Sequence, residues 1–171
     1  MTVETWTPED AARAFGPHDS RARGSLREKI RAESEARRAR YAEFAKLWAD
    51  AHAAGMAAGN AVRPTPMVVC NGDVRINGAP LDPYKPATDI VDVVADGACG
   101  FAWVVVRPGS CSFARWAVKE REGRKEYGGG VRVRWVGEFN QSLERKDAYA
   151  KAFADVLRAA GINAYAHSRM D

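Results

Sequence analysis

A chain of 171 residues with 46% hydrophobic and 28% charged side chains is long enough to bury the core of one ordinary globular domain. No apolar run approaches the roughly 20 residues that a helix needs to cross a bilayer, and the first residues lack the basic-then-apolar pattern of a secretory signal. Three cysteines without a Cys-x-x-Cys pair argue against a disulfide framework and favour a reducing cytosol. The net charge of +4 is modest and selects no partner by itself.

Residues 1–60 are predicted to form a helical arm. A short helix starts at Thr7-Pro8, where threonine caps and proline suits the first helical position, and a polar linker follows to residue 24. Ser25 and Glu28 form a capping box that opens a longer helix, expected to run to Ala58. Its first part is polar, whereas apolar residues recur at helical spacing from Tyr41 onward. The polar part is therefore expected to project into solvent, pair with a second copy or bind a partner.

Residues 61–171 are predicted to form an α+β core. Asn71-Gly72 favours a hairpin, because this pair adopts positive φ at little cost, and Asp96-Gly97 predicts a second turn. Helices are expected after Ser110 or Ser112 and after Ser142. The economical arrangement is a mixed sheet of about five strands with helices mainly on one face, preceded by the long N-terminal helix. The strands are expected at 67–70, 73–76, 89–94, 101–106, 131–136 and 162–166.

The strand at 101–106 carries the most informative pattern. Strand alternation places Phe101 and Trp103 on one face of the sheet. Two large aromatic rings on one face indicate one of two structures. They are either core, buried beneath the apolar part of the long helix, or an exposed platform on which flat ligands stack.

Basic residues are concentrated immediately after this strand. Between Phe101 and Arg134 there are eight basic and three acidic residues, enough for several phosphate contacts if they gather on one surface. The interleaved glutamates are equally compatible with a solvated face of ion pairs. Arg132 and Arg134 are expected on one face of their strand, with Val131, Val133 and Trp135 on the other.

These observations predict a binding site without catalytic machinery. The loop before the predicted helix at Ser110 offers backbone amides to an anion. The three cysteines and three histidines lie in unrelated segments and show no metal-ligand spacing and no nucleophile–base pair, so no catalytic residue, metal or cofactor is predicted. The predicted nucleic-acid or nucleotide site comprises Phe101, Trp103, Arg107, Ser110, Arg115, Lys119, Arg132 and Arg134.

Cys99 to Val106 resembles the RNP1 segment of RNA-recognition motifs, which runs basic-Gly-aromatic-Gly/Ala-aromatic-Val-any-aromatic. The matching residues are Gly100, Phe101, Ala102 and Val104, with Trp103 as a substitute. Cys99 and Val106 depart from the pattern. The family has the order strand-helix-strand-strand-helix-strand, whereas residues 67–100 are predicted to contain no helix between strands.

Pieces of the chain between Cys99 and Arg169 are similar to a group of small uncharacterised proteins of tailed bacteriophages. The shared pieces include Cys-Gly-Phe-Ala-Trp-Val, Ser-Phe-Ala-Arg-Trp, Tyr-Gly-Gly-Gly-Val and Phe-Asn-Gln-Ser. This resemblance implies a phage protein located in the host cytoplasm. It carries no activity and no assigned site residues.

Two hypotheses follow. In the first, a non-enzymatic phage protein binds nucleic acid or a nucleotide through a basic, aromatic-bearing surface. In the alternative, it is a protein-binding module that inhibits a host defence factor or self-assembles through the Ser25–Ala58 helix.

Overall fold

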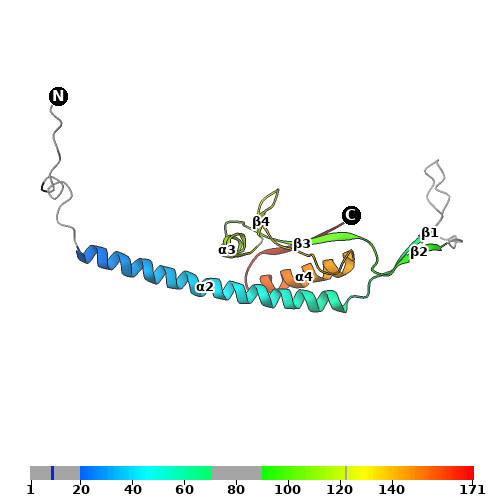
Figure 1. Cartoon of the computed structure of the whole chain (residues 1–171), viewed down its shortest axis with the longest axis horizontal. Coiled ribbons are helices and arrows are strands. Elements are labelled where there is room, and N and C mark those ends of the chain that lie inside the picture. Colours follow the sequence, from blue (N-terminus) through cyan, green and yellow to red (C-terminus); the bar gives the residue numbers. More distant parts are fainter. Residues whose placement is uncertain (1–8, 10–19, 71–89, 122) are drawn as a thin grey trace, which may run out of the picture. The chain divides into compact units, whose positions relative to one another are not determined.

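The computed structural model describes residues 9, 20–70, 90–121 and 123–171, which divide into two compact units, Met1–Ala42 and Glu43–Asp171 (Figure 1). The short helix predicted at Thr7-Pro8 and the strand predicted at 73–76 lie outside the described residues. The elements in chain order are α2 (Ser20–Ala61), β1 (Met67–Cys70), β2 (Ile90–Val94), β3 (Gly100–Val106), α3 (Ser112–Glu120), β4 (Arg124–Lys125), β5 (Val131–Trp135), α4 (Leu143–Ala159) and β6 (Ala164–Met170).

The long helix α2 starts five residues earlier than the capping box predicts, so residues 20–24 are helical instead of a linker. It ends at Ala61, three residues before Pro64, whose ring cannot continue a helix. The two units divide within it, between Ala42 and Glu43, whereas the sequence places the boundary at residue 60. From Ser25 to Ala42 its side chains are mostly polar and exposed, with Leu26 and Ile30 as exposed apolar residues.

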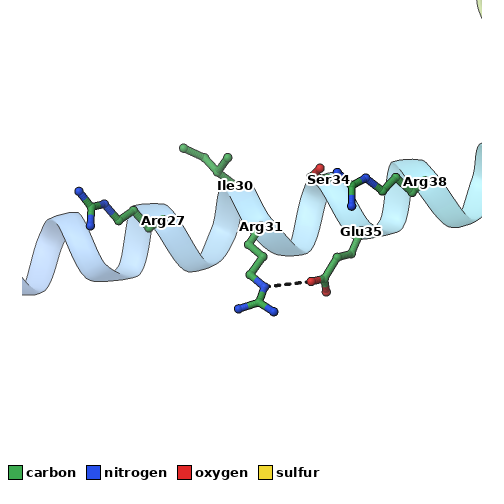
Figure 2. A pocket seen from close by; sticks show the side chains of 6 residues that line it. All are labelled: Arg27, Ile30, Arg31, Ser34, Glu35 and Arg38. Carbon is green, nitrogen blue, oxygen red and sulfur yellow. Dashed lines mark hydrogen bonds and ion pairs between the residues drawn. The ribbon is translucent and has the colours of Figure 1, made fainter.

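A shallow concave patch lies on this polar half of α2 (Figure 2). All the residues that line it belong to the one helix, and an ion pair of 3.0 Å joins Arg31 Nε to Glu35 Oε1 across one turn. Because both side chains are largely exposed, the pair contributes only a few tenths of a kcal/mol, about what isolated helices gain from such pairs. The lining residues are Arg27, Ile30, Arg31, Ser34, Glu35 and Arg38.

From Gly100 onward the elements follow the order β3-α3-β4-β5-α4-β6. They form a four-stranded sheet in the spatial order β4-β5-β3-β6, and each pair of neighbouring strands is antiparallel. Each helix therefore joins two strands that have a third strand between them, the split β-α-β arrangement. The predicted α+β class and long N-terminal helix are confirmed, but the sheet is antiparallel instead of mixed.

The predicted hairpin partner of the first strand, residues 73–76, lies outside the described residues, so that pairing stays a prediction. β1 pairs antiparallel with β2 in a separate two-stranded sheet, with Met67 opposite Val94. The turn predicted at Asp96-Gly97 is present, with Gly97 at φ 74°, but it connects two different sheets. Both strands are short, and alternation alone does not specify which neighbour a short strand pairs with.

The core lies between one face of the four-stranded sheet and a helical layer. Ala102, Val104 and Val106 are fully buried on that face, and α4 lies between β3 and the second half of α2 in Figure 1. Ring contacts fix α2 to the other helices: its Phe44 meets Phe113 of α3 edge-on at 5.4 Å. Further along α2, the Trp48 ring packs against Phe153 of α4 at 5.8 Å. The apolar residues at helical spacing from Tyr41 onward thus pack against other helices.

We expect Gly55→Val to destabilise the fold. A Cβ atom at Gly55 would lie 2.8 Å from two ring carbons of the buried Tyr149, and overpacking of this kind costs about 1–3 kcal/mol. The matched control is Ala57→Val on the exposed side of the same helix, which should lose only the helix propensity difference of about 0.6 kcal/mol. Urea denaturation measures both, and equal losses would contradict the close packing of α2 on α4.

Candidate nucleic-acid interface

A row of stacked rings crosses the sheet on the face opposite the helical layer. Trp103 of β3 lies opposite Trp135 of β5 on one side and opposite His167 of β6 on the other. The two indoles are 5.8 Å apart with an angle of 15° between their planes, and the Trp103 and His167 rings are 5.7 Å apart at 16°. We call these three side chains the ring row and the face that carries them the open face. Phe101 flanks the row, 5.6 Å from Trp135.

Guanidinium groups lie over the rings of this face. The Arg132 guanidinium is 5.1 Å from the centre of the Trp135 ring, and Arg169 is 5.6 Å from the centre of Phe101. At one end of β3, Arg107 lies 6.0 Å from the Tyr165 ring. Cations are attracted to the negative faces of aromatic rings at these distances. The open face therefore combines flat apolar surface with fixed positive charge.

The rings are accessible to solvent. Trp135 is 42% exposed and Tyr165 is 49% exposed, whereas Phe101, Trp103 and His167 are half-buried, partly by one another. In the described part of the chain no helix covers this face, because the apolar half of α2 packs on α3 and α4 instead. Phe101 and Trp103 are therefore not core beneath the long helix; they lie half-buried on the face opposite the helical layer, and their role as a stacking platform stays a prediction.

A β-bulge sorts the two arginines of β5 onto opposite faces. Arg132 lies opposite Val105 and Arg134 lies opposite Val104, so one residue of β5 is extra between these pairs. Trp135 then falls opposite Trp103, on the open face. The prediction that Arg132 and Arg134 share a face, with Trp135 on the other, is therefore wrong, since it assumed an unbroken alternation.

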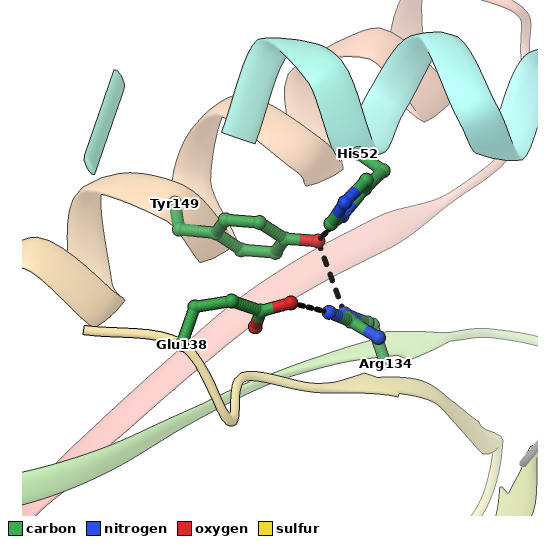
Figure 3. A network of polar contacts seen from close by, with 4 residues as sticks. All are labelled: His52, Arg134, Glu138 and Tyr149. Carbon is green, nitrogen blue, oxygen red and sulfur yellow. Dashed lines mark hydrogen bonds and ion pairs between the residues drawn. The ribbon is translucent and has the colours of Figure 1, made fainter. Parts of the chain in front are cut away.

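Arg134 belongs to a network of polar contacts inside the helical side of the sheet (Figure 3). Its Nε donates a hydrogen bond of 3.0 Å to the Tyr149 hydroxyl oxygen, and its guanidinium pairs with Glu138. A second hydrogen bond, 2.6 Å long, joins the Tyr149 hydroxyl to Nδ1 of His52. These contacts connect β5, α4 and α2 and leave Arg134 turned away from the ring row.

The environment of this network raises the pKa of Tyr149 to about 12. Burial is the largest cause, because it disfavours the charged phenolate. The Arg134 guanidinium opposes the shift by attracting the phenolate, and the Glu138 carboxylate adds to it by repulsion. Tyr149 is therefore neutral throughout the physiological range.

The remaining predicted residues do not join the ring row. Arg115 and Lys119 are exposed on α3, the helix whose inner side packs against Phe44, and this places them in the helical layer. Lys119 lies 3.5 Å from Glu120. Ser110 is exposed and lies one residue before the N-cap of α3. The N-cap is Cys111, whose Sγ accepts a 3.4 Å hydrogen bond from the Ala114 amide. The predicted cap at Ser110 or Ser112 is corrected accordingly.

Sequence reasoning missed several residues of the open face. Trp135 escaped because of the bulge. Tyr165 lies inside the strand predicted at 162–166 but was not placed beside Trp103, because its pairing with the strand at 101–106 was not predicted. His167 and Arg169 were missed because that strand was expected to end at residue 166, whereas β6 continues to Met170. Their spacing of two was the available signal, since alternate residues of a strand share a face.

No family model matches the chain, and neither a curated protein nor a solved structure matches it. Among the residues that the structure describes, no three histidine, cysteine or acidic side chains are placed to hold a metal ion. Over those same residues, no helix has the length and apolar character that crossing a membrane requires.

The raised pKa of Tyr149 makes stability depend on pH in a defined window. The tyrosine ionises near pH 10 in the unfolded chain and near pH 12 in the folded one. The contribution of Tyr149 to the free energy of unfolding is thus fully present below pH 10. It falls by about 1.4 kcal/mol per pH unit from pH 10 to pH 12, where only the unfolded chain has lost the proton. Tyr149→Phe should cost about 1–2 kcal/mol at pH 7 through the lost hydrogen bonds, and the gap to wild type should narrow above pH 10.

Urea denaturation of both proteins at pH 7, 9, 10 and 11 checks this expectation. Tyr127→Phe, which alters a fully exposed ring, is the control. A gap between wild type and Tyr149→Phe that is constant from pH 9 to pH 11 would contradict the raised pKa.

Proposed function

We propose that this protein binds single-stranded nucleic acid on its open face. The observation that carries the proposal is the ring row, with Trp135, Trp103 and His167 stacked across three strands and arginines over the neighbouring rings. Base stacking on aromatic side chains contributes about 1–3 kcal/mol per base and tolerates any sequence. Arginines beside the rings neutralise phosphates, which supplies affinity that depends on salt.

The dimensions of the row favour unpaired bases over a duplex. Neighbouring strands are about 4.8 Å apart, so three strands present a row roughly 10 Å wide, which suits two or three bases. A duplex keeps its bases paired and offers no ring faces for stacking except at its ends. Among the open-face arginines, Arg107, Arg132 and Arg169 lie around the row instead of within it, where the sugar-phosphate backbone would run.

The element order supports the same proposal. From Gly100 onward it is strand-helix-strand-strand-helix-strand, which is the order of RNA-recognition motifs, and those domains stack bases on aromatic residues of their four-stranded sheet. This order begins at β3 (Gly100). The sequence analysis looked for its first helix among residues 67–100, upstream of β3, and therefore did not find the order. Location in the cytoplasm of a phage host completes the proposal and rests on the phage resemblance, whereas binding without catalysis rests on the lack of a nucleophile–base or metal-ligand pattern in the sequence.

Trp135→Ala is the sharpest test of the ring row. Trp135 is the most exposed ring of the row, so its loss should weaken binding roughly tenfold to hundredfold with little effect on the fold. Fluorescence anisotropy with labelled 12-nucleotide DNA and RNA strands at low salt measures the affinity. Tyr127→Ala removes an exposed aromatic ring outside the row and should bind as wild type does.

Salt dependence separates the contribution of the arginines from that of the rings. Arg132→Gln should lower the slope of log affinity against log salt by about 0.7, the value for one phosphate of a single strand. Arg115→Gln, which removes an exposed charge in the helical layer, should leave the slope unchanged. Wild-type protein that binds neither DNA nor RNA strands at low salt would end the proposal.

The protein-binding alternative is favoured by one observation in the first unit. Leu26 and Ile30 lie one turn apart on α2 and are 58% and 57% exposed. If this helix pairs with a second copy or a host protein, Leu26→Glu with Ile30→Glu should abolish the association. Sedimentation velocity measures self-assembly directly, and a sedimentation coefficient unaffected by the double substitution and by dilution would reject this form of the alternative.

A further inference from the structure

A cleft of about 740 Å³ lies along the edge of β5, on the side away from β3. β4 pairs only with Val131 and Arg132, so the described residues provide no strand beside the rest of β5. The cleft lies in this position, between the sheet, the end of α3 and Trp48 of α2. It is lined by Trp48 of α2, Glu120 and Arg121 at the end of α3, Arg124 of β4, and Arg132, Val133, Arg134 and Trp135 of β5.

Positive charge dominates this cleft, because four guanidinium groups line it against one carboxylate. Arg134 is engaged by Glu138 and Tyr149, and Arg132 lies 3.8 Å from Glu126. Arg121 and Arg124 form no ion pair with any other described residue, and both are exposed. Two guanidinium groups are thus available to an anion.

The Arg121 guanidinium is held in position by aromatic rings. It lies 5.1 Å from the centre of Trp48 and 5.6 Å from the centre of Trp116. Such contacts fix the cation without neutralising it, since the rings carry no net charge. Its donors are therefore free to bind a ligand, and a guanidinium binds phosphate oxygens in pairs.

The cleft is continuous with the ring row through Trp135. This indole is both the end of the row at the β5 edge and part of the cleft lining. A base stacked at this end of the row would have its sugar and phosphate at the cleft, beside Arg124 and Arg132, which both line it. The same two residues pair across β4 and β5, so their side chains project from neighbouring strands.

We propose that this cleft binds the terminal phosphate of a nucleic-acid strand whose end base stacks on Trp135. This inference rests on the proposed function and adds to it where the terminal phosphate of the bound strand lies. A terminal phosphate monoester carries about −1.5 to −2 charges at pH 7, against −1 for an internal diester. The two unpaired guanidinium groups, Arg121 and Arg124, match the larger charge.

The test compares three labelled 12-nucleotide strands, bearing a 5′-phosphate, a 3′-phosphate or hydroxyl groups at both ends. We expect wild-type protein to bind one phosphorylated strand about tenfold more tightly than the hydroxyl strand. Arg121→Gln with Arg124→Gln should remove this preference, and inorganic phosphate should weaken it in wild type. Arg121→Lys with Arg124→Lys keeps both charges and should retain part of it.

The matched control removes two exposed positive charges elsewhere, with Arg115→Gln and Lys151→Gln, and should keep the full preference. Equal binding of all three strands by wild type overturns the inference, and so does a preference that survives in the double glutamine variant. The proposed function survives either result as long as the hydroxyl strand binds and Trp135→Ala weakens it.

Failure of the proposed function gives a different result. In that case no strand binds, whatever its ends. Competition by a polyglutamate peptide as strong as that by inorganic phosphate would assign the cleft to acidic protein segments and would also overturn the inference.

Discussion

The packing of α2 on α3 and α4 determines what the sheet can do. Phe44 and Trp48 pack against rings of the two shorter helices, and the Arg134 guanidinium of β5 lies over Trp48 from the same side of the sheet, so the apolar half of the long helix packs on the helical side and leaves the open face uncovered. One sheet face is buried by this helical layer, with Val104 fully enclosed. The other face keeps its large aromatic residues in contact with solvent. Exposed rings of this size are uncommon on a protein surface without a binding role, and the functional proposal follows from that.

The bulge in β5 gives two arginines of one short strand different roles. Arg134 is turned inward, where Glu138 and the Tyr149 hydroxyl satisfy its donors, as a part-buried guanidinium requires. Arg132 is turned outward over Trp135. A regular strand would place both arginines on one face and would break the stacking of Trp135 on Trp103. One inserted residue therefore produces both the internal network and the ring row.

The sequence predicts well where local signals are strong. The strand at Gly100–Val106 and the helix after Ser142, with Tyr149 and Phe153 buried, follow from alternation and helical spacing. β4 could not be found, because two exposed basic residues have no pattern. Without β4, the sequence does not show that the sheet is antiparallel. The chain reverses between β4 and β5 at three glycines, 128–130, which have positive φ. The open face was predicted in part: placing Phe101 and Trp103 on one face needs only the alternation of one strand, whereas placing Trp135 and His167 beside them needs pairings between distant segments.

The stacked indoles of Trp103 and Trp135 also have an optical consequence. Two chromophores held 5.8 Å apart and nearly parallel couple electronically, so their near-ultraviolet circular dichroism differs from the sum of two isolated indoles. A planar molecule that inserts beside or between them alters that coupling and their emission together. The chain thus contains an intrinsic reporter at the very surface where a ligand would arrive, readable without any attached dye.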